Sequence, residues 1–227
     1  MLIKIISEES HALFHEKRSC FVTSFVHNHS PLNFFFLLYN PIAYLGNQVV
    51  NGINHAILCE QVLTTATDDR NIVILILNEK PGDVTGESIS IVEINRVLDG
   101  SHLMGGINIA PTIEIPALAM NAYNSRFGGL LGATNVPIAL LATQVVNGVA
   151  YYFAVESTMV VGPTGDVDVI GSSDKTASVR IVKIFDNYPE IQSRVVLTGS
   201  KEEADDDEEE MNGSLVKQTF GYAFTWR

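Results

Sequence analysis

The sequence is poor in cysteine and tryptophan, and nothing in it suggests a disulfide framework. It has 227 residues with two cysteines, Cys20 and Cys59, and one tryptophan, Trp226. The cysteines lie in unlike contexts without the spacing of a stapled scaffold. Cys59 follows an apolar run, and we interpret it as a small buried hydrophobe.

Clustered basic residues and long apolar runs are also lacking. The formal net charge is −12, but eight of the nine residues at 202–210 are acidic, and the rest of the chain has 18 acidic and 14 basic residues. We interpret the acidic run as a solvated, self-repelling loop; a role in binding a cation or a partner is the alternative. Without a basic patch we expect no nucleic-acid binding. The apolar stretch at 31–46 is too short and interrupted to span a bilayer, and no signal core follows the N-terminus, so we expect a cytoplasmic protein that does not bind membranes.

The usual catalytic and cofactor motifs are missing as well. The chain has no nucleophile elbow, phosphate loop or dinucleotide fingerprint. His11 and His15 are four residues apart, but Ala12 occupies the position where a metalloprotease has glutamate. His55 and Cys59 would share one strand face, yet no third group to orient them is evident. We therefore predict no enzyme, no metal site and no cofactor.

A repeat is the most informative feature that is present. Residues 41–52 (PIAYLGNQVVNG) match residues 137–148 (PIALLATQVVNG) at nine of twelve positions without a gap. Such self-similarity indicates two copies of one supersecondary unit. In both copies Asn-Gly lies between apolar stretches, a pattern that predicts a two-residue hairpin turn.

The sequence around each copy predicts an α+β fold with two units, each a helix packed on a four- to five-stranded antiparallel sheet. Apolar, β-branched runs follow each Asn-Gly pair and predict strands. Helices are expected within 9–30 and after Thr112, a candidate N-cap, the latter helix beginning near Pro116 and ending at Gly128-Gly129. We place the first unit at 1–100 and the second at 101–227. The second would include an acidic loop at 201–210 and a C-terminal extension that adds a last strand.

The second copy resembles the stefins, the disulfide-free branch of the cystatins. Stefins begin near a Met-x-Gly-Gly segment and continue through one helix, a Gln-x-Val-x-Gly hairpin and a second hairpin holding proline. Here the corresponding pieces are MGG (104–106), residues 112–131, QVVNG (144–148), VRIVKIFDNYPE (179–190) and RVVLTG (194–199). The first copy keeps QVVNG at 48–52 and NEKPGD at 78–83 but lacks a glycine-rich trunk.

The resemblance implies a reversible inhibitor that occludes the cleft of a papain-like cysteine protease without reacting. The implied contacts in the second copy, the better match, are Gly105, Gly106, Gln144, Val145, Val146, Asn147, Gly148, Tyr188 and Pro189. Those in the first copy are Gln48, Val49, Val50, Asn51, Gly52, Pro81 and Gly82. We expect a stiff Asn-Gly tip, exposed valines and a glutamine that braces the hairpin through hydrogen bonds.

Plainer interpretations stay open for each piece. Each QVVNG is also explained as a hairpin whose valines pack inward, MGG as an interdomain linker, and Tyr188-Pro189 as a turn. The competing function is therefore a non-inhibitory structural or protein-binding module.

Overall fold

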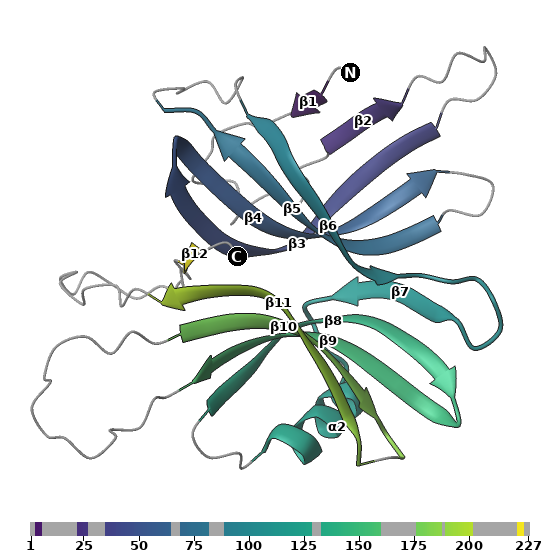
Figure 1. Cartoon of the computed structure of the whole chain (residues 1–227). Coiled ribbons are helices and arrows are strands. Elements are labelled where there is room, and N and C mark those ends of the chain that lie inside the picture. The colour runs from purple at the N-terminus through teal and green to yellow at the C-terminus, as the bar shows by residue number, and fades with distance from the viewer. Residues whose placement is uncertain are drawn as a thin grey trace, which may run out of the picture.

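The computed structural model describes residues 3–5, 22–26, 35–64, 69–81, 89–128, 133–159, 176–187, 189–201 and 222–224. These residues form two antiparallel sheets and one helix (Figure 1). The first sheet has the strand order β1-β2-β3-β4-β5-β6, with bounds Ile3–Ile5, Val22–Val26, Phe35–Val50, Gly52–Thr64, Asp69–Glu79 and Ser90–Asp99. The second has the order β12-β11-β10-β9-β8-β7; β7 to β12 span Ile107–Thr112, Ala133–Val146, Gly148–Met159, Thr176–Phe185, Ile191–Lys201 and Tyr222–Phe224.

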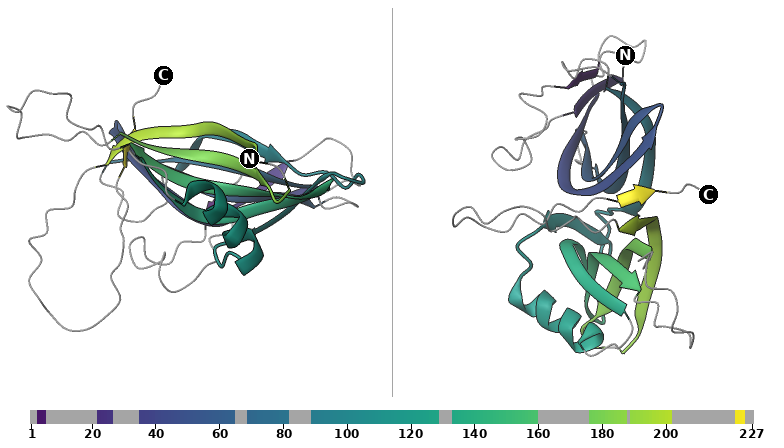
Figure 2. Two further views of the ribbon diagram at one scale, coloured as in Figure 1. Left: turned by 90° about the horizontal axis from the view of Figure 1, so that it is seen from below. Right: turned by 90° about the vertical axis from the view of Figure 1, so that its left-hand side faces the viewer.

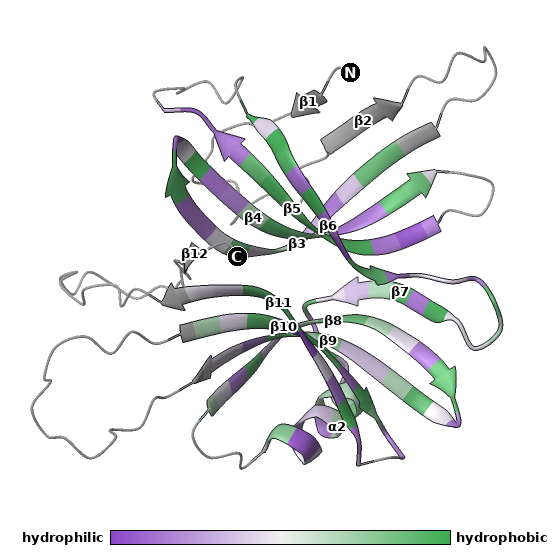
Figure 3. Ribbon diagram, viewed as in Figure 1, coloured by the Kyte–Doolittle hydropathy of each residue, from purple (hydrophilic) through white to green (hydrophobic). Residues whose placement is uncertain are grey.

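The two sheets pack face to face and share one apolar core (Figures 1 and 2). Leu58 and Ile74 enter this core from the first sheet, and Leu141 and Ala154 enter it from the second; all four are almost fully buried. Apolar and polar segments alternate along the strands (Figure 3). In β5 the buried run covers residues 72–77 without a break because apolar clusters lie on both faces of this strand.

Helix α2 (Ala117–Phe127) packs against the other face of the second sheet. It begins directly after Pro116, which has no N–H to satisfy, and ends at Gly128, as the sequence predicts. Its buried residues, Ala119 and Tyr123, contact a cluster that includes Phe153 of β9. Thr112 does not cap the helix: it ends β7, and its hydroxyl accepts a hydrogen bond from the Glu114 N–H.

The predicted pair of helix-on-sheet units is wrong. The described part of the segment at 9–30 is strand β2, which pairs with Phe35–Tyr39 at the start of β3. The corresponding strand of the second half, β7, pairs with the other end of its neighbour: it lies against Leu140–Gln144 of β8, near the hairpin tip. Valine and phenylalanine in this N-terminal segment favour an extended chain over a helix. The inner face of each sheet is covered by the other sheet, so the largest apolar cluster is shared by the two halves, while each half keeps a smaller cluster on its outer face.

The repeated sequence forms the two predicted hairpins, β3–β4 and β8–β9. In both copies the strand register shifts after the proline, between Pro41 and Ala43 and between Pro137 and Ala139. Proline is tolerated at such bulges, which also bend the strand. The isoleucine after each proline packs on the shared core. The repeated Pro-Ile-Ala therefore shapes the contact between the sheets, and the tips of the two hairpins lie at opposite ends of the sandwich (Figure 1).

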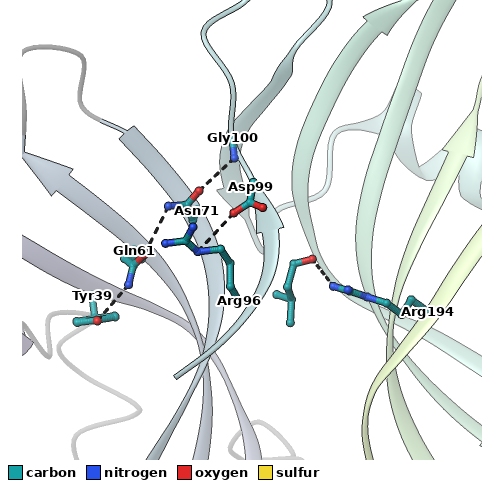
Figure 4. Close-up of polar contacts among 8 residues, drawn as sticks. Tyr39, Gln61, Asn71, Arg96, Asp99, Gly100 and Arg194 are labelled. Carbon is teal, nitrogen blue, oxygen red and sulfur yellow. Dashed lines mark hydrogen bonds and ion pairs between the residues drawn. The ribbon is translucent and has the colours of Figure 1, made fainter. Parts of the chain in front are cut away.

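Polar contacts secure the region where the chain passes from one sheet to the other (Figure 4). The guanidinium of Arg194 in β11 donates a hydrogen bond of 2.6 Å to the carbonyl oxygen of Val97 in β6. The Gly100 N–H donates to the side-chain oxygen of Asn71 and to the carbonyl oxygen of Arg70. The chain therefore leaves the first sheet at a fixed point. Among the described residues, no helix has both the length and the hydrophobicity needed to cross a membrane.

Candidate functional site

The segment between the sheets contains a tight turn, which we call the trunk turn (Leu103–Gly106). The Gly106 N–H donates to the Leu103 carbonyl oxygen at 2.8 Å, and Gly105 has a φ of 74°. A positive φ at the third residue is the signature of a type II turn and favours glycine. A Cβ on Gly106 would lie 2.6 Å from the Ser101 carbonyl oxygen. Both glycines are thus needed for the turn itself, which exposes 79% of Leu103 and all of Met104.

The β8–β9 hairpin presents its two valines differently. Val145 is 72% exposed, whereas Val146 is partly buried and packs on the core between the sheets. Neighbouring residues of a strand face opposite sides, so one valine anchors the hairpin while the other faces solvent. Gly148 closes the tip with a φ of 112°. Of the predicted valine contacts in this copy, the structure leaves Val145 the better placed to meet another protein.

The β10–β11 hairpin is attached to the β8–β9 hairpin. The Asp186 carboxylate accepts a hydrogen bond from the Val149 N–H at 3.0 Å, and the Asp186 N–H donates to the Val149 carbonyl oxygen. The Asn187 amide donates to the Asn147 carbonyl oxygen at 3.4 Å. Pro189 is exposed, and Tyr188 lies outside the described residues. Asn147 and Pro189 therefore belong to neighbouring hairpins whose tips lie at the same end of the second sheet.

Gln144 joins the trunk turn to the second sheet. Its side-chain N–H donates to the Gly105 carbonyl oxygen at 2.8 Å. Its side-chain oxygen accepts from the Tyr152 hydroxyl at 2.7 Å and from the Lys183 ammonium at 3.0 Å. Gln144, on β8, thus contacts the trunk turn and the two strands β9 and β10. We call the trunk turn, residues 144–148 and the described residues Asp186, Asn187 and Pro189 the binding edge.

Sequence reasoning missed Tyr152 and Lys183. They lie on strands β9 and β10, and only the strand register places them opposite each other. The Lys183 nitrogen also lies over the rings of Tyr152 and Phe185, 5.2 and 4.7 Å from their centroids. No local motif in the sequence signals this arrangement.

The first copy presents a simpler tip. Val49 is 81% exposed and Val50 45% exposed. Gly52 has a φ of 107°, and the residues at 48–52 form the end of the β3–β4 hairpin. Ala56 and Ile76 are paired across β4 and β5 where Tyr152 and Lys183 are paired in the second copy. Pro81 is exposed, and Gly82 lies outside the described residues.

The candidate catalytic and metal-binding residues are engaged elsewhere or are not described. His55 contacts the Tyr44 hydroxyl and the Glu79 carboxylate, each at 3.0 Å, while the buried Cys59 thiol donates weakly to the Ile57 carbonyl oxygen. Burial raises the pKa of Tyr44 above its usual value. The described residues contain no cluster of three or more side chains able to hold a metal ion. Cys20 and the histidines at 11, 15, 27 and 29 lie outside the described residues. Of the acidic loop predicted at 201–210, only Lys201 is described, and it ends β11.

A hollow of about 270 Å³ lies beside the trunk turn, lined by Arg70, Ser101, His102 and residues of β7. The His102 ring nitrogen Nε2 lies 3.4 Å from the carboxylate oxygen of Asp69. The hollow is smaller than most pockets that enclose a small ligand. The exposed apolar residues of the binding edge are therefore the better candidates for function.

Comparisons with protein-family models, curated proteins and solved structures find no match to this chain.

Proposed function

We propose that the binding edge enters the active-site cleft of a papain-like cysteine protease and inhibits the enzyme reversibly by occlusion. The observation that carries this proposal is the joining of three narrow chain segments at one edge by Gln144, Asp186 and Asn187. Leu103, Met104 and Val145 expose apolar side chains from two of these segments. Moving such side chains out of water into a groove supplies a favourable free energy of binding.

The order of elements in the second half also supports this proposal. Strand β7, helix α2 and strands β8 to β11 follow the trunk turn in sequence, and the Gln-Val-Val-Asn-Gly stretch forms the β8–β9 hairpin. Apart from β7, which the stated pattern does not include, this is the order implied by the resemblance to the stefins. Because the trunk turn and both hairpins are ordered before binding, association would cost little conformational entropy.

A non-inhibitory scaffold or protein-binding module is the second candidate. One observation favours it: the repeated Ile-Ala pair and the following leucines, Leu45 and Leu141, pack in the core between the sheets. These repeated residues are thus accounted for by the fold without any partner. The repeat does not account for the exposed Leu103 and Met104, which occur only before the second copy.

The proposal includes a cytoplasmic location. Its support in the sequence is that the two cysteines, Cys20 and Cys59, lack the spacing of a disulfide framework.

The test is a titration of papain with the full chain. The full chain is needed because a fragment lacking the first sheet would expose the inner face of the second. We expect stoichiometric loss of papain activity at micromolar concentration, with no cleavage of the inhibitor. Val145→Asp should weaken this inhibition. Its matched control is Val49→Asp, which places the same charge on the equivalent valine of the β3–β4 tip and should leave inhibition unchanged. Full papain activity in the presence of excess folded wild-type protein would refute the proposal.

A further inference from the structure

The side chain of Gln144 contacts donors on one side and an acceptor on the other. Tyr152 and Lys183 both direct N–H or O–H groups at its oxygen, and the Gly105 carbonyl receives its N–H. An amide has two acceptor sites on oxygen and two donors on nitrogen, so these partners fit one orientation of the group. Turning the amide over would set its N–H groups against the two donors and its oxygen against a carbonyl.

Lys183 is held where it can enforce that orientation. Its ammonium group lies over the Tyr152 and Phe185 rings and donates to Gln144. Among the described residues, no carboxylate forms an ion pair with it. A cation without a carboxylate partner gains from an amide oxygen and from aromatic faces. Tyr152 is itself 6% exposed and packs in the core between the sheets. The core therefore holds the Tyr152 ring, which carries one donor and lies under the other.

We propose that Lys183 and Tyr152 are positioning residues for the binding edge: they fix the Gln144 amide, which in turn holds the trunk turn against the β8–β9 hairpin. Through this chain of contacts the exposed Leu103 and Met104 are held beside Val145. The first copy has Ala56 and Ile76 at the corresponding pair and lacks both donors. The inference rests on the proposed function, because it explains how the occluding edge is ordered before it meets the protease.

The expected effect on affinity follows from populations. If loss of the donors leaves the trunk turn in its binding arrangement about a tenth of the time, apparent affinity falls about tenfold. This loss does not require the protein to unfold, because the apolar parts of both side chains can remain in place. Lys183→Met keeps the unbranched apolar stem, and Tyr152→Phe keeps the ring.

The experiment uses the full chain and two measurements on each variant. Backbone amide order parameters at Met104 and Gly105 report whether the trunk turn is fixed, and the inhibition constant against papain reports binding. In Lys183→Met and Tyr152→Phe we expect order parameters to fall from about 0.85 toward 0.6. We expect inhibition to weaken about tenfold, with the midpoint of thermal unfolding nearly unchanged. Lys183→Arg keeps a donor and should restore both properties.

Two further variants separate positioning from general stability. Tyr151→Phe removes a hydroxyl from the adjacent residue, which packs toward helix α2, and should change neither measurement. Gln144→Glu keeps an acceptor for Lys183 but removes the donor to Gly105, so it should mobilise the turn even with Lys183 in place.

Unchanged order parameters in Lys183→Met and Tyr152→Phe would overturn the inference. If the wild-type protein inhibits papain, mobility of the turn without weaker inhibition would overturn it as well. If the wild-type protein does not inhibit papain while both variants still mobilise the turn, the proposed function fails and the brace itself stands.

Discussion

The two valines of the β8–β9 hairpin allow binding and folding to be separated in one pair of substitutions. Val145 is 72% exposed, whereas Val146 packs on the core between the sheets. Replacing each with aspartate introduces the same charge at adjacent positions. We expect Val145→Asp to weaken inhibition strongly while leaving the protein folded, and Val146→Asp to destabilise the protein.

The magnitudes follow from exposure. Fully burying a valine side chain contributes about 2 kcal/mol, so covering the exposed 72% of Val145 would contribute about 1.4 kcal/mol, or roughly tenfold in affinity. An aspartate there would also lose hydration inside a cleft, at a cost of several kcal/mol unless it finds a partner. Inhibition should therefore weaken by more than about a hundredfold. The free energy of unfolding should change by less than about 0.5 kcal/mol, as for other exposed positions.

Val146→Asp should behave in the opposite way. A carboxylate against the apolar core lowers the free energy of unfolding, by about 2 kcal/mol or more. Urea unfolding gives the stability of both variants, and papain titration gives their inhibition constants. If Val145→Asp inhibited as well as the wild type, the exposed face of this hairpin would not be the contact surface. If instead it unfolded the protein, our assignment of Val145 to the solvent would be wrong.

Two further predictions concern backbone and burial. Alanine at Gly52 or Gly148 should lower the free energy of unfolding by about 1–3 kcal/mol because both glycines have positive φ. Urea unfolding should show the larger loss for Gly52→Ala, because its Cβ would meet the Glu79 backbone carbonyl, whereas a Cβ at Gly148 would meet only the ends of side chains. Equal losses in the two variants would refute this steric argument. The buried hydroxyl of Tyr123 has no hydrogen-bond partner among the described residues, so Tyr123→Phe should stabilise the protein by about 1 kcal/mol in thermal unfolding. Burial raises the pKa of Tyr123 to about 12, above the usual 10.0, so the wild type should lose stability as pH rises through this interval, and a variant with the same alkaline loss would contradict the assignment.

Local signals were enough to predict the hairpins and the described helix. Asn-Gly between apolar stretches gave both tips, and Pro116 with Gly128 bounded helix α2. Residues 22–26 form strand β2 and not the expected helix because their β-branched and aromatic side chains favour an extended chain. A helical length alone does not overcome that preference.

Packing of the two sheets was harder to foresee, although one signal was present. The uninterrupted apolar run at 72–77 is typical of a strand covered on both faces, which implies a further layer. The sequence does not say what that layer is. The binding edge shows the same division: the glycines and valines are recognisable motifs, whereas the contacts of Gln144 with Tyr152 and Lys183 depend on register across three strands.

The sheet-on-sheet contact has a consequence for how the protein behaves at low concentration. Both sheets belong to one chain and are joined by the short connection between Asp99 and Ile107. Their association is therefore unimolecular, and its equilibrium does not shift on dilution as that of two separate subunits would. However scarce the protein becomes, each molecule keeps its halves together.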